Sequence, residues 1–334
     1  WELNNIKKPK RFITATGGKM AFTGLYKTLF SAPNMKEAQR FYKDWGLRKI
    51  KATSAHSIFE TKIGSRVELK LPGAENLPPA AAPDLHFREM IWGVSSKKHL
   101  AEIKRELLKD REVTTDKDGT LHCIDPNGLG VGFKVWKPRT KIDGRRSKIN
   151  SFDKQERVDE ISVFYKDARP IRMGHIGFIL PDLKAAEKFY KDRLGFWLSD
   201  RYGNAALFLR CAAESQHHNL FMIWSEAGNT KYHHTAFEVR DIHEVFGGGV
   251  AFDKKGWQTE VGPGRHPISS AYFWYFKAPC GGAIEYFTDS DYLTENWKPH
   301  NYQNNLFSEW HLPDGIKQVP DGKIRPSVSA AGKH

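Results

Sequence analysis

Two stretches of the chain repeat one pattern of apolar and polar residues. "TGLYKTLFSAPNMKEAQRFYKDWGL" begins at Thr23, and "RMGHIGFILPDLKAAEKFYKDRLGF" begins at Arg172. Each predicts a strand, a turn at proline, a helix with apolar residues at helical spacing, and a closing glycine. A shift of 148 residues places Phe189 on Phe41 and aligns both copies of FYKD. From there the distance to the closing glycine differs by one residue. We interpret the pair as an internal duplication.

Each half continues with a second unit of the same kind. "LHFREMIWGVSSKKHLAEIKREL" from Leu85 and "HHTAFEVRDIHEVF" from His233 each predict a strand followed by a helix, and further strands follow both. The chain therefore contains four units of roughly β-α-β-β-β. Strands and helices are mixed rather than strictly alternating, which favours an α+β fold over a doubly wound sheet. We predict two domains, each built from paired βαβββ modules.

The connection between the halves is polar and aperiodic. The alternating segment "GVGFKVWKP" ends at Pro138 as a terminal strand would, and charged residues follow as far as Arg172. We expect an N-terminal domain at 1–140, a linker at 141–170, a C-terminal domain at 171–290 and a C-terminal extension at 291–334.

Net charge is +13, and part of the excess lies in "KKPKR" (from Lys7) and "KPRTKIDGRRSK" (from Lys137). A solubilising tail and linker explain these runs most simply, and attraction of anionic molecules is the alternative. Because no nucleic-acid motif accompanies them, we expect no nucleic-acid partner.

The apolar runs and the cysteines indicate the cellular compartment. No apolar run approaches the ~18 residues of a membrane span, so we expect no membrane association. Three widely spaced cysteines argue against a disulfide framework and favour a reducing cytoplasm. Since the chain begins with Trp1 rather than Met, we expect that it lacks its natural start, and a removed leader stays an open alternative.

Two histidines and one glutamate occupy corresponding strands of the second half. His175 and His234 lie in the first strands of their units, and Glu285 lies in a last strand, after a Gly-Gly turn. Alternate residues of a strand share a face, so one residue from each of three strands can converge. Two imidazoles and one carboxylate form the facial triad of non-haem Fe(II) sites. Taken singly, each histidine is better explained by a structural role, and the spacing alone is a weak metal signal.

Five segments carry a specific resemblance: "MGHIGF", "HHNLFMI", "YHHTAFEV", "GRHPISSAYFWY" and "GGAIEYF". With them, the chain from Arg172 onward resembles the type I extradiol ring-cleaving dioxygenases of the vicinal oxygen chelate superfamily, the relatives of 2,3-dihydroxybiphenyl and catechol 2,3-dioxygenases. The first half resembles them only in architecture. The resemblance implies a catecholic substrate, O₂, mononuclear Fe(II) with Mn(II) as the alternative, a muconic semialdehyde type of product, and a homo-oligomer.

The same resemblance implies roles for individual residues. His175, His234 and Glu285 match the metal ligands of the family. The catalytic positions are matched by His218, an acid/base expected to titrate near neutrality, and by His266 and Tyr275, beside the metal-bound oxygens. Pro267 and Ile268 depart from the polar residue that the family often has there, which leaves the substrate contacts on that side open. His217 and His233 are either strand neighbours facing away or groups that orient a ligand.

Other residues receive structural interpretations. We expect Phe178, Phe208 and Phe237 to lie in the core rather than the pocket, and Cys280 to be structural. In the first half, Lys27, Glu89 and Gly132 stand where the second half has its three metal ligands. A charged lysine has no lone pair to offer a cation. The first half is therefore scaffold and interface, or else it keeps a second ligand site in a vestigial cavity.

Two other functions compete with ring cleavage. One is a glyoxalase-like isomerase or epimerase, which usually needs four protein ligands and is disfavoured by Lys27 and Gly132. The other is a metal-free module that binds an aromatic compound, which has no need of the six matched residues together. Monocyclic, bicyclic and trihydroxylated substrates all remain open.

Overall fold

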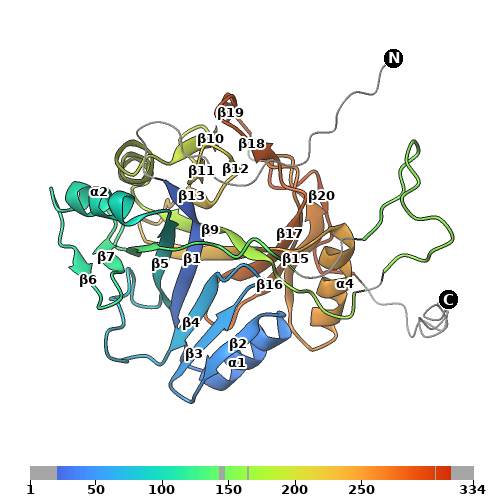
Figure 1. Cartoon of the computed structure of the whole chain (residues 1–334), viewed down its shortest axis with the longest axis horizontal. Coiled ribbons are helices and arrows are strands. Elements are labelled where there is room, and N and C mark those ends of the chain that lie inside the picture. Colours follow the sequence, from blue (N-terminus) through green and yellow to red (C-terminus); the bar gives the residue numbers. More distant parts are fainter. Residues whose placement is uncertain (1–20, 143–146, 164, 305, 317–334) are drawn as a thin grey trace.

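The computed structural model describes residues 21–142, 147–163, 165–304 and 306–316, and its secondary structure is dominated by two large sheets (Figure 1). The basic run from Lys7 and the part of the extension beyond 316 lie outside the described residues. The predicted α+β class is confirmed, with the sheets formed by the two halves of the chain. The predicted boundaries at 140, 170 and 290 stay predictions.

The first sheet has eight strands in the order β2-β3-β4-β1-β5-β8-β7-β6. Its elements are β1 (Phe22–Ser31), α1 (Met35–Asp44), β2 (Arg48–Ala52), β3 (His56–Glu60), β4 (Arg66–Lys70), β5 (Phe87–Val94), α2 (Lys97–Leu107), β6 (Thr114–Thr115), β7 (Leu121–Ile124) and β8 (Gly130–Val135).

The second sheet has ten strands in the order β19-β10-β11-β13-β9-β14-β17-β16-β15-β20, and β12 pairs separately with β18. The elements of this half are β9 (Arg172–Leu180), α3 (Leu183–Glu187), the π-helix η1 (Lys188–Arg193), β10 (Trp197–Tyr202), β11 (Ala206–Arg210), β12 (Ser215–Gln216), β13 (Leu220–Trp224), β14 (Lys231–Glu238), α4 (Ile242–Asp253), β15 (Thr259–Arg265), β16 (Tyr272–Lys277), β17 (Ala283–Thr288), β18 (Tyr292–Leu293), β19 (His300–Tyr302) and β20 (Trp310–His311).

Pairing within the sheets reproduces the four predicted units. β1 pairs in parallel with β4, β5 with β8, β9 with β13, and β14 with β17. Each of these pairs encloses one βαβββ module. The first strands of neighbouring modules, β1 with β5 and β9 with β14, pair antiparallel and join two modules into one sheet. The strands β9, β14 and β17 are therefore adjacent at the centre of the second sheet.

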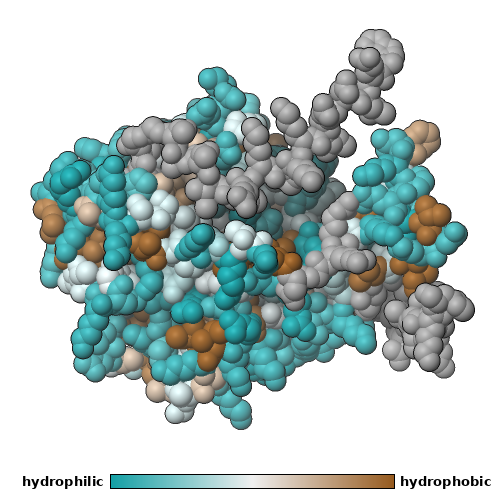
Figure 2. Space-filling model, in the orientation of Figure 1, coloured by the Kyte–Doolittle hydropathy of each residue, from teal (hydrophilic) through white to brown (hydrophobic). Residues whose placement is uncertain are grey.

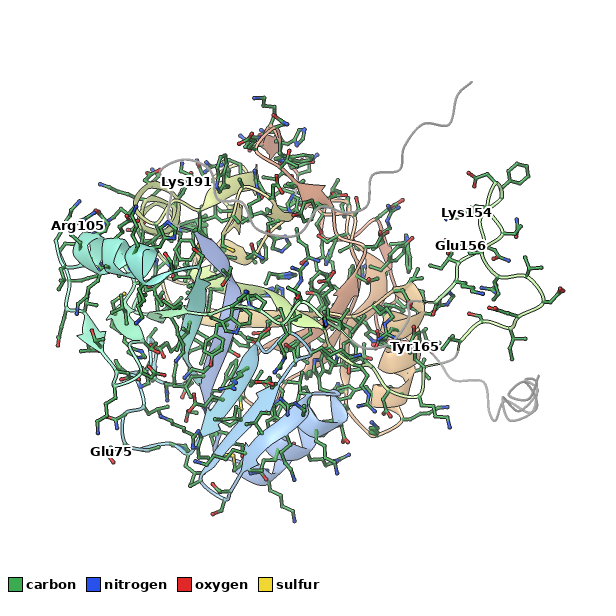
Figure 3. The ribbon with its side chains drawn as sticks, viewed as in Figure 1. Glu75, Arg105, Lys154, Glu156, Tyr165 and Lys191 are labelled. Atoms are coloured by element: carbon green, nitrogen blue, oxygen red, sulfur yellow. The ribbon has the colours of Figure 1, made fainter. Side chains whose placement is uncertain are left out.

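The predicted linker carries no helix or strand in its described parts. Between Ser147 and Val163 it projects from the body, with the labelled Lys154 and Glu156 on the projection and Tyr165 where the chain rejoins the body (Figures 1 and 3). Side chains of Asn150 and backbone groups of Arg157 hydrogen-bond across it. Figure 2 shows hydrophobic residues on this projection, and the side chain of Phe152 is fully exposed.

A single hydrophobic core joins the two halves. Buried residues from β1, α1, β5, β9, β14 and β17 belong to one cluster. The α-helices begin at side chains that cap the first backbone N–H groups, such as Asn34 before α1 and Asp241 before α4. Cys123, Cys211 and Cys280 are buried and free. Within the described ranges no helix has both the length and the apolar character needed to cross a membrane.

Candidate metal centre

The three predicted ligands meet on adjacent central strands. In the pairing of β9 with β14, His175 lies opposite Ala236 and His234 lies opposite Gly177. β14 and β17 then place Ala236 beside Glu285. The side chains of all three ligands are buried, with exposed fractions of 6% for His175, 2% for His234 and 0% for Glu285. One central position on each of three neighbouring strands thus faces the same point.

Distances within this group fit a shared ion. The Nε2 atoms of His175 and His234 lie 2.9 Å apart. Oε2 of Glu285 lies 3.3 Å from the first and 3.5 Å from the second. Within the described part of the chain, this is the group of His, Cys, Asp and Glu side chains that meets the geometry of a metal site. Two imidazoles and one carboxylate on one side of an ion suit Fe(II) or Mn(II) and leave other positions open.

The surroundings of Glu285 favour a cation at this group. Both carboxylate oxygens are buried, and no hydrogen-bond partner for them is found among the described residues. A buried carboxylate without donors is costly unless a positive charge compensates it. Burial alone raises the pKa of this carboxyl, but the adjacent His175 and His266 imidazoles outweigh it and lower the net pKa below the usual value. The group is therefore an anion, as a metal ligand must be.

The pKa and the position of His234 also suit a metal ligand. Burial first, and then the neighbouring His233 imidazole, lower its pKa well below the ordinary histidine value. A neutral imidazole keeps a lone pair for a metal. Its position also depends on Gly177, because a Cβ there would lie only 2.8 Å from Cε1 of His234. The glycine in "HIGF" thus makes room for the ring on the next strand.

A cavity of about 190 Å³ opens over the ligands. His218, His266 and Tyr275 line it together with the triad, so the structure brings all six predicted site residues into one place. Their catalytic roles remain predictions. The other lining residues are Tyr202, Phe208, Phe221, Ile223, His233, Ile268, Ser269, Ala271, Phe287, Ser290, Leu306 and Phe307.

His218 lies against the triad, with its ring centroid 4.1 Å from that of His175. Burial first, and then the surrounding imidazoles, lower its pKa well below the ordinary value. This direction runs against the expectation that His218 titrates near neutrality, and its cause is the crowding of several imidazoles in one buried site. His218 is therefore neutral, with a lone pair on one ring nitrogen.

His266 and Tyr275 form a pair on the opposite side. Nδ1–H of His266 donates to the carbonyl oxygen of Phe307 at 2.6 Å, so its Nε2 accepts from the Tyr275 hydroxyl at 3.2 Å. That Nε2 is 3.8 Å from Oε1 of Glu285. Burial, and then the Glu285 charge, raise the pKa of Tyr275 well above the usual value. Its hydroxyl therefore keeps its hydrogen and remains a donor.

Several wall residues correct or extend the sequence prediction. Phe178 and Phe237 lie in the core as expected, but Phe208 lines the cavity and stacks on Phe221 at 4.7 Å between centroids. Leu306 and Phe307 reach the cavity from the extension. No local signal marked Leu306 or Phe307, because only the folded chain returns the extension to the site.

The two ambiguous histidines differ in position. Nδ1 of His233 lies 2.6 Å from Nδ1 of His234, and His233 also lines the cavity. His217 is fully buried behind His218 and bonds to Asp200.

Cys280 is buried near the end of β16, and burial raises the pKa of its thiol to about 12, in keeping with a structural role.

The first half carries ion pairs where the second half has its ligands. Lys27 lies opposite Ile91, Leu29 opposite Glu89, and Ile91 beside Gly132. This register matches that of β9, β14 and β17 position for position, so the predicted correspondence of Lys27, Glu89 and Gly132 with the ligands is confirmed.

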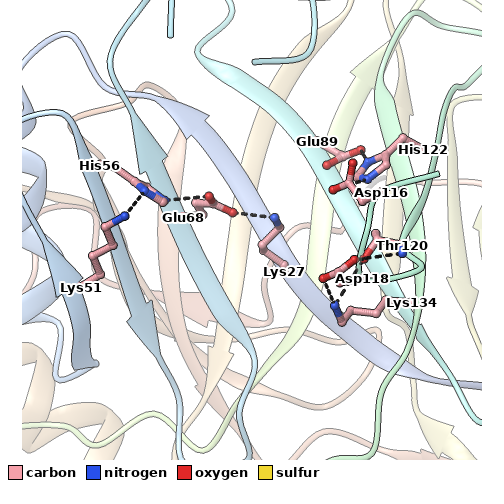
Figure 4. Close-up of polar contacts among 10 residues, drawn as sticks. All are labelled: Lys27, Lys51, His56, Glu68, Glu89, Asp116, Asp118, Thr120, His122 and Lys134. Atoms are coloured by element: carbon pink, nitrogen blue, oxygen red, sulfur yellow. Dashed lines mark hydrogen bonds and ion pairs between the residues drawn. The ribbon is translucent and has the colours of Figure 1, made fainter. Parts of the chain in front are cut away.

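Figure 4 shows what these positions do instead of binding metal. Nζ of Lys27 binds Glu68, which also contacts His56, while Glu89 and Asp116 hold His122 between them. The positive charges of Lys27 and His122 are neutralised within the protein. In the first half, the buried carboxylates of Glu68 and Glu89 are thus paired with side chains of the protein itself, Lys27 and His122.

Comparison with known proteins agrees with this geometry. Residues 172–286 match the sequence profile described as "Glyoxalase/Bleomycin resistance protein/Dioxygenase superfamily". Metapyrocatechase 2 of Cupriavidus necator is 31% identical over 51% of this chain and 52% of its own length. 2,2',3-Trihydroxybiphenyl dioxygenase of Sphingomonas paucimobilis is 29% identical over 41% of this chain and 48% of its own. The chain spans about half the length of the curated relatives it matches.

Solved structures share the fold over most of the chain. The Mn(II)-bound glyoxalase from Novosphingobium aromaticivorans superimposes with a TM-score of 0.70 and 18% identity, covering 89% of this chain and 93% of that one. For 2,2',3-trihydroxybiphenyl 1,2-dioxygenase from Sphingomonas wittichii strain RW1, the TM-score is 0.65 at 17% identity, with 89% and 100% covered. The match to this superfamily profile thus covers residues 172–286 of the chain, and the fold shared with solved extradiol dioxygenases extends over most of it.

Proposed function

We propose that this protein cleaves the ring of a catecholic compound next to its hydroxyls, using O₂ and a mononuclear Fe(II), in the degradation of aromatic compounds. The product would be a muconic semialdehyde type of compound. The observation that carries the proposal is the His175–His234–Glu285 triad, buried at the floor of a cavity that His218, His266 and Tyr275 also line. The names of the sequence relatives, a metapyrocatechase among them, support the same activity.

The metal would activate the substrate hydroxyls, and the side chains would transfer protons and donate hydrogen bonds. When bound at the triad, a divalent metal lowers the pKa of a coordinated hydroxyl and leaves positions open for O₂. His218 is neutral and would accept a proton from the substrate, then return it later in the reaction. Tyr275 keeps its hydroxyl hydrogen, which it donates to Nε2 of His266 and would donate to a substrate oxygen instead when substrate is bound. His266, anchored by the Phe307 carbonyl, holds the hydroxyl in place before substrate binds.

The cavity favours a small, flat substrate. Its volume of about 190 Å³ lies below the ~300–1,000 Å³ of pockets for larger ligands. Phe208 and Phe221 supply aromatic walls, which suit a ring, and Phe307 closes another side. These features favour a single-ring catechol over a bicyclic one. The largely apolar lining would also keep water away from the reacting oxygens.

The same ligand set accepts Mn(II). One relative is named a manganese-dependent 2,3-dihydroxybiphenyl 1,2-dioxygenase, from Geobacillus genomosp. 3, and it is 24% identical over 57% of this chain. Iron is our first choice, because the triad with open positions is the arrangement of non-haem Fe(II) oxygenases. Metal analysis of the purified protein decides between them.

A metal-assisted isomerase is the second candidate, and the Mn(II)-bound glyoxalase with the same fold is the observation that favours it. Such enzymes usually draw on four protein ligands. In this chain Lys27 and Gly132 occupy the positions in the first half that would supply more. A triad with three protein ligands suits ring cleavage better.

Two further proposals concern the protein's setting. We expect a cytoplasmic protein, since its three cysteines are free and buried. We also expect a homo-oligomer, which size-exclusion chromatography with light scattering would measure.

The test compares two histidines in protein purified without oxygen. His234→Ala should lose bound iron, because it removes a ligand. His218→Ala should keep iron but turn over catechols about 10²–10⁴-fold more slowly, since it removes only proton transfer. Iron is measured by mass spectrometry, activity by O₂ uptake and by the yellow product, and His243→Ala on α4 serves as the control that should change neither.

A thermal shift supplies a readout that needs no turnover. Fe(II) or Mn(II) at about 100 times its Kd should stabilise the wild type by about 2.7 kcal/mol and leave Glu285→Gln unmoved. If iron-loaded wild type consumes no O₂ with any mono-, bi- or trihydroxylated ring of this class, ring cleavage is rejected. Equal iron loss in His234→Ala and His218→Ala would reject the assigned roles.

A further inference from the structure

A buried hydrogen-bonded chain lies behind His218. Nδ1 of His218 is 3.1 Å from Nδ1 of His217, and Nε2 of His217 is 2.8 Å from Oδ2 of Asp200. Exposed fractions are 9% for His218, 0% for His217 and 1% for Asp200. Asp200 lies on β10, and neither Asp200 nor His217 lines the cavity.

We propose that Asp200, acting through His217, fixes the tautomer of His218 so that the lone pair of its Nε2 faces the cavity. His217 and Asp200 are thus positioning residues for the proton acceptor. The assignment of that acceptor rests on the proposed function, whereas the tautomer itself can be measured without it.

The hydrogen bonds from Asp200 through His217 to His218 determine which nitrogen of His218 carries the hydrogen. An ionised carboxylate only accepts, so Nε2 of His217 carries the hydrogen that Asp200 receives. In a neutral imidazole the other nitrogen is then an acceptor. Nδ1 of His217 therefore receives a hydrogen from Nδ1 of His218. With its Nδ1–H committed, neutral His218 has its lone pair on Nε2, the nitrogen left for a molecule in the cavity.

The two oxygens of Asp200 are not interchangeable. Oδ1 accepts the backbone N–H of His300 at 2.6 Å and also lies 3.1 Å from Nδ1 of that residue. Strand β19 holds His300 in place by pairing with β10, where His300 lies beside Asp200. Trp297 adds a bond from its indole N–H to the carbonyl oxygen of Ser199 at 2.8 Å. Oδ2 is thus the oxygen that faces His217.

This asymmetry makes Asp200→Asn a directed test. The backbone N–H of His300 can only donate, so the amide oxygen of the new side chain has to take the place of Oδ1. The amide NH₂ then faces Nε2 of His217, which must become an acceptor. His217 in turn donates from Nδ1, and His218 is forced to carry its hydrogen on Nε2. The substitution should reverse both tautomers at nearly constant shape.

The experiment observes the hydrogens directly. Full-length, metal-free protein with ¹⁵N-labelled histidine is studied by long-range ¹H–¹⁵N NMR, which separates Nδ1–H from Nε2–H, with His217→Gln and His218→Gln assigning the signals. We expect Nε2–H at His217 and Nδ1–H at His218 in the wild type, and the reverse in Asp200→Asn. Asp192→Asn, on the exposed turn of η1, is the matched control and should change neither.

Activity supplies the second arm. Asp200→Asn should bind as much iron as the wild type but lose about 10–100-fold in kcat, with KM little changed. Nε2–H at His218 in the wild type, or a doubly protonated His217, overturns the proposal, as do unchanged tautomers in Asp200→Asn. If that variant does not fold, the wild-type spectrum alone decides. Expected tautomers without activity toward any catechol would reject the proposed function and leave the positioning pair standing.

Discussion

At the scale of single residues, Lys27 and His175 occupy corresponding positions but have different electrostatic surroundings. Glu285, beside His175, is a buried carboxylate with no hydrogen-bond partner among the described residues, and the pKa of the neighbouring His234 is lowered well below the usual value. Glu68 faces Lys27, whose ammonium lies 2.5 Å away. The Lys27 ammonium supplies the positive charge in the first half, whereas the corresponding position of the second half carries His175, a predicted metal ligand.

His122 gives the first half a pH-dependent contribution to stability. Burial lowers its pKa, but hydrogen bonds and charge from Glu89 and Asp116 outweigh burial and raise the net pKa above the usual value. Because the folded state binds this proton more tightly, the stabilisation is complete below the unfolded pKa of ~6.5 and is lost as pH rises through the folded value.

We therefore expect His122→Gln to lower the free energy of unfolding most near pH 5. The difference from the wild type should shrink steadily toward pH 9. Urea titrations at each pH measure it, with His99→Gln on α2 as the control. A difference that grows with pH would contradict the ion-pair interpretation.

At the scale of secondary-structure elements, close packing explains features that local propensity does not. The helix of the third module has one residue more than α1, and the π-helical turn η1 (Lys188–Arg193) takes up this residue before Gly195. A π-turn is the usual way in which a helix absorbs one inserted residue. The one-residue difference after FYKD in the two repeats thus has a structural cause.

Helix α4 contains Gly247, Gly248 and Gly249 in its interior, at a cost of up to ~1 kcal/mol each relative to alanine. The structure shows why two of them are needed. A Cβ on Gly249 would lie 2.1 Å from Trp274, and one on Gly248 would lie 2.6 Å from Ala168. Because these glycines have no Cβ, α4 can pack closely against β16 and against the linker at Ala168.

Gly249→Ala should consequently destabilise the protein by about 1–3 kcal/mol, although alanine is the better helix former. Thermal and urea unfolding measure the change. His243→Ala on the same helix, away from this contact, should stay within about 0.5 kcal/mol of the wild type. A gain in stability for Gly249→Ala would show that the close approach to Trp274 is not maintained.

At the scale of the whole molecule, the two halves share contacts next to the metal centre. The ring of Trp45, at the end of α1, stacks on Tyr286 with 3.5 Å between centroids, and the Tyr286 hydroxyl donates to the carbonyl oxygen of Trp45 at 2.8 Å. Both rings are fully buried. Since Tyr286 follows Glu285 on β17, the first half supports the strand that carries a predicted ligand.

Trp45→Ala should therefore reduce stability by about 3–5 kcal/mol and also weaken metal binding, although Trp45 lies in the half without ligands. Tyr286→Phe keeps the stacking and loses only the hydroxyl bond, so about 1–3 kcal/mol is expected. Urea unfolding and a metal titration measure the two effects. Unchanged metal affinity in a folded Trp45→Ala protein would show that the halves act independently.

The four modules and the alignment of the two halves could be predicted because they depend on local sequence patterns. Strand and helix periodicity with the repeated FYKD predicted four modules. The alignment of Lys27 with His175 was correct because both copies share one strand register. Phe208 is buried in a hydrophobic cluster, as predicted, but it also lines the cavity, and a buried aromatic on a strand has the same sequence pattern in both settings.

The sequence by itself determined the α+β class and the modules, because these follow from residues near one another in the chain. It also predicted the ligand set, through the resemblance of its second half to a known family. Only the tertiary structure decided what surrounds the site. It brought His300 to Asp200 and Phe307 to His266 through pairing and contacts over long separations. It also set the low pKa of His218, because burial and neighbouring charges depend on which distant segments meet.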